Sequence, residues 1–444
     1  MNITRLSWKN IIAKPLNTGL SVLLFALSIG LIAFLALFNH QLINGLDRNL
    51  ANIDLVIGAK GSPLQLILNS MYHIDAPNGN IPLAEAAPFL NPQHPLIAVS
   101  VPLSLGDSYG AYRIVGTTPS FLSFYGADQV DGEIFKNDFD ALVGSVVAAK
   151  LHLHIGDAFH STHGLLDDPD MAHDHGTAFV VRGILKQTGT VVDQLILCTP
   201  QSIWKVHEHD TAVALSETDS LHTHSHSETT HHHNDVAYQA MDQASAQMGT
   251  DSILAELRAQ PEKEITSILV RFKNKTNIQS LNFLRNINSN TGLMAASPAL
   301  ELNRLYAMLG SGTDALQYLA YLIALVAAIS IFISLYASLK ERKYEMAILR
   351  VGGAGPGLLF RLILWEGLWI SLLGLAIGLV SAHLGMQMAG EALERSYKYA
   401  FTGWIWIREE WWIVIGGLLI GILAALLPAI QGSRVNLHKT LAEG

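Results

Sequence analysis

Cysteine and charged residues are both scarce in this chain of 444 residues. The single cysteine, Cys198, excludes an internal disulfide framework and a zinc site built from cysteines. Charged residues make up 15% of the sequence and hydrophobic residues 50%, which is too apolar for an ordinary soluble protein. The net charge of −9 argues against nucleic acid as a partner. This composition favours a few membrane spans joined to a large polar part.

Motifs of catalysis and nucleotide binding are missing as well. The sequence has no His-Glu-x-x-His zinc-protease motif and no Gly-x-Ser-x-Gly nucleophile elbow. The fragment at residues 58–62, Gly-Ala-Lys-Gly-Ser, has its lysine before the second glycine, whereas a phosphate loop needs the order Gly-Lys-Ser/Thr. We interpret this fragment as a turn and expect no enzyme activity in the chain itself.

Four apolar runs are long enough to cross a hydrocarbon core of about 30 Å as helices. We predict transmembrane helices at residues 16–40, 314–339, 358–385 and 411–430. Residues 1–15 alternate cations with apolar side chains, which predicts an amphipathic helix in the membrane interface. The predicted fold class is membrane α-helical, with four transmembrane helices and a large extracytoplasmic α+β domain inserted between helices one and two, at residues 41–313.

Short β-branched runs bounded by glycine, proline or aspartate predict strands within this domain. They lie at residues 97–101, 112–115, 179–184, 191–197 and 268–272. Helical patterns are expected at residues 142–153, 253–259 and 278–286. Residues 207–249 consist mostly of His, Ser, Thr, Asp and Glu, and such a segment cannot bury enough apolar surface to fold alone, so we predict a flexible loop there.

Lysine and arginine indicate the orientation of the predicted spans. Four spans place both ends of the chain, including the tail 431–444, on the same side as the connection 340–357. That side carries nine cations, whereas the opposite loop 386–410 balances three cations with four glutamates. Because short cytoplasmic loops are enriched in cations, we expect both termini in the cytoplasm and the large domain outside. Tryptophans 404, 406, 411 and 412 suit the outer membrane interface.

The connection 340–357 is charged at first and then rich in glycine. We interpret it as a segment that docks a partner, because its cations and carboxylates allow charge pairing and its apolar side chains, including Ile348, can fill a groove. Its glycines allow a sharp turn into the next span. The candidate coupling residues are Glu341, Arg342, Lys343, Tyr344, Glu345, Met346, Leu349, Arg350, Gly352 and Gly353. The alternative is an ordinary basic loop between two spans.

Glu366 is an acidic residue inside the third predicted span, about 12 Å along its helix. A carboxylate in hydrocarbon costs several kcal/mol unless it is paired or protonated. One interpretation is a polar contact with a neighbouring helix that senses motion of the span. The alternatives are reach to the interface and pairing with Arg361. The spacings Gly374/Gly378 and Gly417/Gly421 allow close helix packing, although glycine is common in spans generally.

Histidine is the outlier of the composition. Fourteen of the 19 histidines lie between His152 and His233. Neutral imidazole binds Zn²⁺, Cu²⁺ and Ni²⁺, and alternating histidines in a flexible loop can converge on one ion. We expect loosely bound zinc, or copper or nickel, and no firmly bound cofactor. The alternatives are a solvated spacer and a pH sensor. The candidate metal ligands are His173, His175, His207, His209, His222, His224, His226, His231, His232 and His233.

Three stretches resemble the ABC-transporter permeases of the macrolide-exporter (MacB-like), lipoprotein-release and FtsX-like family. The stretch Glu341-Arg-Lys-Tyr-Glu-Met-Ala-Ile-Leu-Arg-Val-Gly-Gly353 is similar to that family's cytoplasmic turn after the second span. Residues 428–441 resemble its closing motif, and residues 142–157 resemble a strand-turn unit of its external domain. Glu366 matches an acidic position of the family. The histidine clusters are not part of the family pattern.

This resemblance implies a permease subunit in a bacterial cytoplasmic membrane, with ATP hydrolysis on a separate cytoplasmic ATPase. It also implies a homodimer or a heterodimer with a second permease, contact with membrane lipid, and ATP-driven motion of the periplasmic domain. Together with the histidines it suggests transition-metal transport and a periplasmic metal-binding partner. The alternatives are an FtsX-like regulator of a cell-wall enzyme, a lipoprotein-release permease and a non-energised membrane metal sensor.

Overall fold

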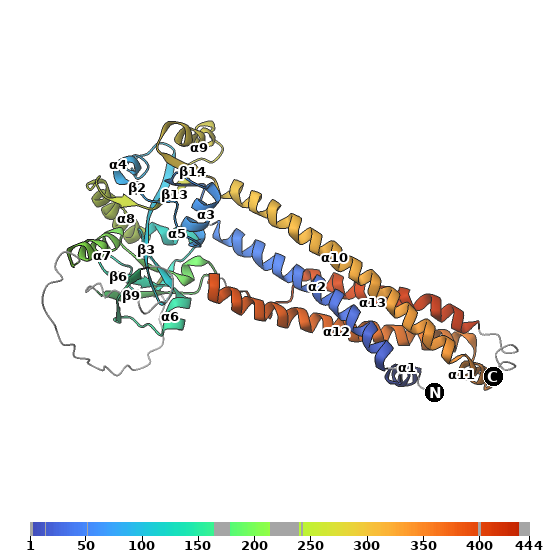
Figure 1. Cartoon of the computed structure of the whole chain (residues 1–444). Coiled ribbons are helices and arrows are strands. Elements are labelled where there is room, and N and C mark those ends of the chain that lie inside the picture. Colours follow the sequence, from blue (N-terminus) through green and yellow to red (C-terminus); the bar gives the residue numbers. More distant parts are fainter. Residues whose placement is uncertain are drawn as a thin grey trace. The chain divides into compact units, whose positions relative to one another are not determined.

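The computed structural model describes residues 3–13, 15–50, 52–163, 178–213, 239–240, 243–397 and 401–434. The chain forms two compact units (Figure 1). Unit 1 contains residues 1–44 and 307–444, and unit 2 contains residues 45–306. Each unit has a hydrophobic core of its own.

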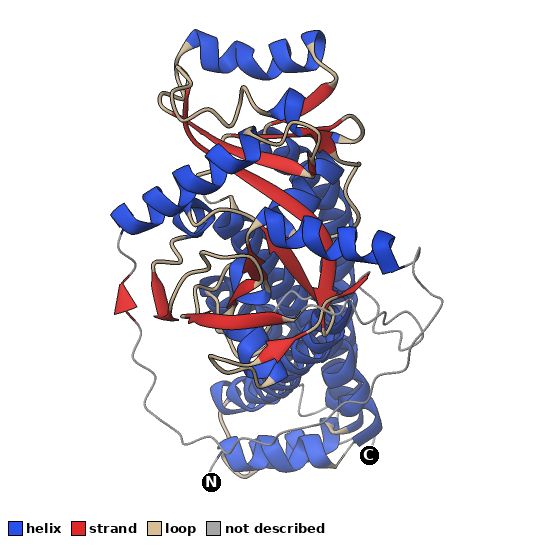
Figure 2. Ribbon diagram, turned by 90° about the vertical axis from the view of Figure 1, so that its left-hand side faces the viewer, coloured by secondary structure: helices blue, strands red, loops and turns tan. Residues whose placement is uncertain are grey.

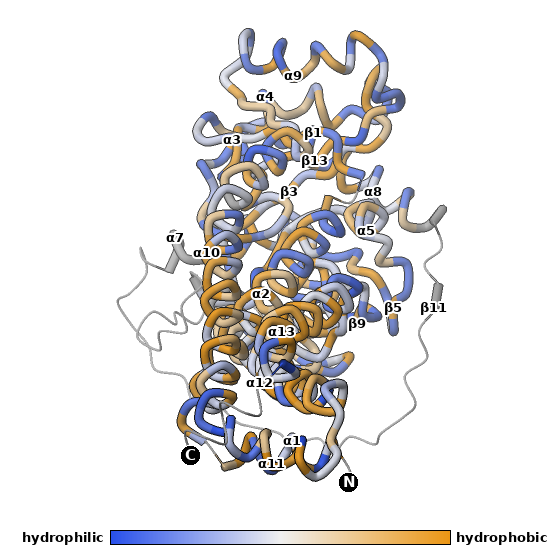
Figure 3. The backbone as a smooth tube through the Cα atoms, turned by 90° about the vertical axis from the view of Figure 1, so that its right-hand side faces the viewer, coloured by the Kyte–Doolittle hydropathy of each residue, from blue (hydrophilic) through white to orange (hydrophobic). Residues whose placement is uncertain are grey.

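Unit 1 is helical. Within the described residues, four helices are long and apolar enough to cross a membrane, which makes the chain a membrane protein. Figure 3 shows hydrophobic residues along these helices. The long helices are α2 (Pro15–Asn49), α10 (Pro298–Glu341), α12 (Pro356–Tyr397) and α13 (Arg408–Ser433). Two short helices, α1 (Ile3–Ile12) and α11 (Lys343–Val351), complete the set.

Small residues let the long helices of unit 1 pack closely. Gly421 on α13 faces Ser371 on α12, and a Cβ atom at Gly421 would lie 2.3 Å from the Cβ atom of Ser371. Around this contact, Phe25 of α2, Ile370 of α12 and Ala425 of α13 belong to one buried cluster, to which α1 and α10 also contribute. The interpretation of Gly421 as a packing position is therefore favoured over general glycine abundance.

Each long helix extends beyond the span that the sequence predicts. The first begins one residue before the predicted 16–40 and continues to Asn49, and α10 begins at Pro298 rather than at residue 314. The third continues to Tyr397, so the connection predicted at 386–410 is partly helical. Hydropathy marks only the apolar part of a helix, and polar residues without proline continue the helix beyond it.

Unit 2 is built on a mixed sheet, with its strands in red in Figure 2. Among the described residues the sheet has 12 strands, in the order β11-β5-β9-β6-β10-β4-β3-β13-β1-β14, with β7 paired to β9 and β8 paired to β3. The pairs β10–β4 and β6–β9 are parallel, and the other pairs are antiparallel. A separate pair joins β12 to β2.

The bounds of the strands follow the buried runs of the sequence. They are β1 (Leu55–Ala59), β2 (Ile81–Pro82), β3 (Ile97–Tyr109), β4 (Tyr112–Gly116), β5 (Gln129–Gly132), β6 (Asp140–Val143), β7 (Ala158–Phe159), β8 (Thr162–His163), β9 (Phe179–Leu185), β10 (Ile196–Cys198), β11 (Gln239–Ala240), β12 (Glu264–Ile265), β13 (Ser267–Phe272) and β14 (Leu293–Ala296). In one core cluster, Ile114, Val143 and Ile196 from neighbouring strands are fully buried.

Helices join these strands and complete unit 2. They are α3 (Pro63–Tyr72), α4 (Leu83–Ala86), α5 (Ser120–Tyr125), α6 (Ser145–Leu151), the 3₁₀ helix η2 (Val191–Gln194), α7 (Pro200–Val213), α8 (Gln243–Arg258) and α9 (Ile278–Asn290). Helix α3 shows why such helices begin where they do. Ser62 caps it by accepting a hydrogen bond from the backbone of Gln65, and Pro63 occupies its first position.

Two predictions within unit 2 are wrong in part. Residues 191–197 are a 3₁₀ helix followed by a short strand, because the Asp193 carboxylate accepts hydrogen bonds from Thr188 and Gly189 and fixes a tight turn. Residues 142–153 are not one helix, because fully buried Leu142 and Val143 complete β6 before α6 begins. Tertiary burial overrides the local pattern in both places.

The flexible loop predicted at 207–249 is helical at both ends. Helix α7 continues to Val213 and α8 begins at Gln243. Buried Ile203 and Val206 anchor α7 on the core, so the helix extends into the polar segment that follows. The centre of the predicted loop, at residues 214–238, lies outside the described residues.

Candidate coupling site

Helix α11 is the structured centre of the predicted docking segment. Glu341 ends α10, and Arg342 then leaves the helical conformation with φ −101° and ψ 11°, so that α11 starts in a new direction. At its other end the Gly352 amide donates to the carbonyl of Ile348 at 2.9 Å. Gly353 follows with a φ of +94°, a conformation that favours glycine. The chain therefore passes through one residue with a left-handed backbone conformation before α12 begins.

Two faces of α11 have opposite roles. Met346 is 3% exposed and Ala347 is fully buried, and Met346 packs with Leu359 and Ile363 of α12. Tyr344, Ile348 and Val351 are 50%, 51% and 68% exposed. Their spacing of four and three residues places them on one side of the helix. We call these three residues the α11 stripe.

The predicted docking residues separate along these faces. Met346 lies inside the unit and cannot contact a partner, and Leu349 is partly buried against the same cluster. Lys343, Glu345, Gly352 and Gly353 are exposed, as is Glu341. Arg350 is half-buried. The sequence identified the segment but could not separate its supporting residues from its exposed ones, because both faces contain apolar side chains.

Arg342 points into unit 1 and makes two ion pairs. Its guanidinium lies 2.8 Å from the Glu345 carboxylate and 3.4 Å from the Glu366 carboxylate. The Arg342 side chain is only 17% exposed. This cation is thus engaged within the chain, and Lys343 is the exposed cation beside it.

Glu366 is 4% exposed and connects three helical segments. Its Oε1 atom accepts a hydrogen bond of 2.5 Å from the Asn10 side-chain amide and lies 3.4 Å from Arg342 Nη1. The interpretation that Glu366 contacts a neighbouring helix is supported, since Asn10 belongs to α1. Its burial argues against reach to the interface, and Arg342 rather than Arg361 is its described ion-pair partner.

Helix α1 packs on α12 beside this contact. The Ser7 hydroxyl, fully buried, donates to the backbone carbonyl of Leu362 at 3.1 Å. About two turns farther along α12, Trp8 meets Trp369 edge-on with ring centroids 5.1 Å apart. The sequence pointed to an amphipathic α1 but did not reveal Ser7 and Asn10, because small polar residues give no periodic signal.

A second polar pair lies farther along α12 and also escaped the sequence analysis. His383 Nε2 lies 3.3 Å from the Glu410 carboxylate, and Glu410 is fully buried in the first turn of α13. The other ring nitrogen of His383 contacts the carbonyl oxygen of Gly403 at 2.5 Å. Trp406 stacks on the imidazole with an interplanar angle of 12°. The sequence offered one signal for this pair, namely that the acidic residue Glu410 directly precedes an apolar run.

The predicted metal ligands lie mostly outside the described residues. These are His173, His175, His222, His224, His226, His231, His232 and His233. His207 and His209 are on α7, and the structure describes only their backbone. Over the part of the chain that is described, no three histidine, cysteine or acidic side chains come together as a metal site.

Comparison with known proteins gives one family match. Residues 318–437 match the family model of the FtsX-like permease C-terminal domain. The matched stretch contains α11 and Glu366 and reaches from within α10 beyond the end of α13. Over these residues, the resemblance that the sequence suggested to FtsX-like ABC permeases is thereby confirmed. No curated protein matches the chain.

Proposed function

We propose that this chain is the permease subunit of an ATP-binding-cassette complex and that its ATPase is a separate cytoplasmic subunit. The α11 stripe carries the proposal. Tyr344, Ile348 and Val351 expose a row of apolar side chains on a helix that Met346 anchors to α12. An exposed apolar helix face held on a rigid support suits docking into a groove of a partner. The FtsX-like permease family generally works with an ATPase partner.

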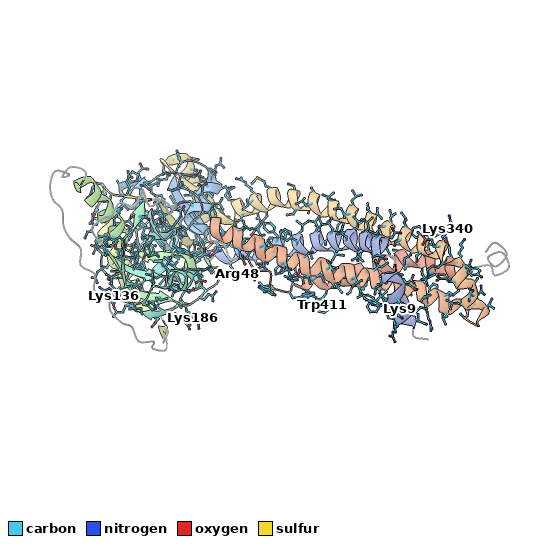
Figure 4. All side chains as sticks on the ribbon, turned by 60° about the horizontal axis from the view of Figure 1, so that its bottom comes forward. Lys9, Arg48, Lys136, Lys186, Lys340 and Trp411 are labelled. Carbon is cyan, nitrogen blue, oxygen red and sulfur yellow. The ribbon has the colours of Figure 1, made fainter. Side chains whose placement is uncertain are left out.

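The proposed topology places α1 and α11 at the cytoplasmic side of a bacterial inner membrane. Lys9 and Lys340 lie toward one end of unit 1, and Trp411 lies away from that end (Figure 4). Cations at one end and exposed tryptophans elsewhere agree with the charge and aromatic rules for membrane proteins. Unit 2 would then be the extracytoplasmic domain between the first and second spans, and both termini would be cytoplasmic. A dimer of permeases would present two copies of the α11 stripe.

The proposed mechanism is transmission of motion. Binding and hydrolysis of ATP would move the partner, the partner would displace α11, and the long helices would carry the displacement to unit 2. Helices suit this role because their backbone hydrogen bonds are internal to each segment. Three functions agree with this mechanism: a transport permease, an FtsX-like regulator of a cell-wall enzyme and a lipoprotein-release permease. They differ in what unit 2 acts on.

Transition-metal handling is a further prediction from the sequence. Fourteen histidines between residues 152 and 233 supply many imidazole ligands on one segment of the chain. Zinc comes first among the metals because imidazole and carboxylate are both common zinc ligands. The described part of the chain contains no group of side chains that forms a metal site.

The test is the affinity of the full chain, in nanodiscs, for an ABC ATPase subunit that co-purifies with it from its native membrane. Ile348→Asp places a charge in the centre of the α11 stripe, and we expect the affinity to fall by at least about 100-fold. Ile278→Asp is the matched control, because Ile278 is 73% exposed on α9 of unit 2. Equal affinity of the Ile348→Asp variant and the wild type would refute docking on α11. Absence of any ATPase binding to the wild type would refute the permease proposal.

A further inference from the structure

Glu366 joins parts of unit 1 that are far apart in the sequence. Asn10 on α1 donates to Glu366 Oε1 at 2.5 Å, and Arg342 between α10 and α11 approaches the same oxygen at 3.4 Å. The carboxylate itself belongs to α12 and is 4% exposed. A buried carboxylate holds such partners firmly, because losing either one leaves a desolvated charge with less compensation.

A small polar cavity lies beside this carboxylate. Its volume is about 20 Å³, which is enough for a water molecule. Its wall includes residues from α1, α2, α10 and α12, among them Asn10, Asn17, Ser338 and Glu366. The Ser338 carbonyl in this wall also accepts the Arg342 amide at 3.2 Å. The cavity wall is thus polar beside the carboxylate that contacts both Asn10 and Arg342.

Arg342 connects this junction directly to α11. It lies one residue before the helix, and its guanidinium also pairs with Glu345 in the first turn of α11 at 2.8 Å. A displacement of α11 therefore moves the guanidinium, and the guanidinium acts on the carboxylate that holds α1. The order of contacts is Glu345, Arg342, Glu366 and Asn10.

We propose that Glu366 is a positioning residue that links α1 to α11, so that the two short helices respond together when either is displaced. Through this link, α1 moves together with α11 when a partner displaces α11. Its use in transmission rests on the proposed function, but the link itself is a property of the permease alone. Glu366 need not touch the ATPase for this role.

The experiment measures amide hydrogen exchange of α1, residues 4–12, in the full chain in nanodiscs without any partner. Glu366→Gln keeps the shape of the side chain and removes its charge, and we expect α1 exchange to accelerate about tenfold. Arg342→Ala changes a residue outside α1, and we expect about threefold acceleration in the wild-type background. In the Glu366→Gln background the same Arg342→Ala change adds nothing, because the negative charge with which Arg342 pairs is already gone.

Lys343→Ala is the matched control, since Lys343 is the exposed cation next to Arg342. It should leave α1 exchange unchanged. If the Glu366→Gln protein does not fold, Asn10→Ala cuts the link from its other side, and Arg342→Ala must then add nothing to that variant. The proposal is overturned if Arg342→Ala leaves α1 unchanged, or if it accelerates exchange equally in both backgrounds. These results do not depend on ATPase binding, so they separate failure of the link from failure of the proposed function.

Discussion

Two carboxylates are buried among the described residues of unit 1, on neighbouring long helices, and their surroundings differ. Glu366 on α12 contacts Asn10 and Arg342, which belong to α1 and to the start of α11. Glu410 on α13 contacts His383 of α12, whose imidazole is fixed in turn by the Gly403 carbonyl. Helix α12 contributes Glu366 to the first group and His383 to the second, and these two residues are about 25 Å apart along the helix.

The difference lies in what each carboxylate holds. Glu366 connects to a short helix with an exposed apolar stripe, so its surroundings can be moved from outside. Glu410 joins the start of α13 to α12 and to the connection that contains Gly403 and Trp406, and its Oε1 atom has no hydrogen-bond partner among the described residues. We infer that Glu366 serves motion and that Glu410 serves the fixed packing of the helices.

The largest effect expected on stability is at Glu410. Glu410→Ala removes the partner of His383 from a fully buried position, and we expect unfolding to become easier by about 3 kcal/mol. The matched change Glu409→Ala should cost less than about 0.5 kcal/mol, because the Glu409 side chain is 57% exposed. Denaturant unfolding in mixed micelles measures both. Similar stabilities of the two variants would remove the distinction between the carboxylates.

The packing between the long helices gives the next effect. Gly421→Ala brings a Cβ atom to 2.3 Å from Ser371, and we expect a loss of about 2 kcal/mol. Gly416→Ala on the same helix meets nothing within 4 Å and should be neutral or stabilising by up to about 1 kcal/mol. Melting of the two variants in the same detergent compares them. A neutral Gly421→Ala would show that α12 and α13 are loosely packed where Gly421 faces Ser371.

A buried ionisable group of unit 2 provides a contrast to both carboxylates. Burial, reinforced by the nearby Arg113 cation, lowers the pKa of His73 to about 3. The unfolded chain takes up the proton near pH 6.5 while the folded chain does not, so stability falls as the pH drops through this window. We expect the wild type to lose about 2 kcal/mol between pH 6.5 and pH 5.

His73→Asn removes this titration and suits the left-handed backbone of residue 73, where φ is 53°. The variant should therefore lose less stability than the wild type over the same pH range. Thermal unfolding of the full chain at pH 6.5 and pH 5 measures the difference. An equal loss in both proteins would show that His73 is not the group responsible.

The smallest structural effect is expected in the histidine-rich segment. Changing His222, His224, His226, His231, His232 and His233 together to asparagine keeps the length and polarity of the segment. Stability should change by less than about 0.5 kcal/mol, whereas zinc affinity measured by calorimetry should fall at least about tenfold. Unchanged zinc affinity would end the metal prediction and leave the comparison of the two carboxylates intact.

The sequence predicted the features of this protein that depend on long runs. Four long apolar helices follow from hydropathy, and the turn after α11 follows from the glycines of residues 352–357. Contacts between distant residues gave no such signal. Asn10 and Arg342 meet at Glu366 only because α1 folds onto α12, and His383 meets Glu410 only because α13 returns beside α12. The two faces of α11 could not be assigned for the same reason, since the burial of Met346 depends on α12.

Docking on α11 is tested most directly by photo-crosslinking of the full chain in a complex with the proposed ATPase subunit. A photoreactive phenylalanine analogue replaces Tyr344 in the α11 stripe, or Trp412 on α13, and the two aromatic residues are 50% and 72% exposed. We expect a crosslink to the ATPase from position 344 and none from position 412. A crosslink from position 412, or none from position 344 in a complex that hydrolyses ATP, would contradict docking on α11.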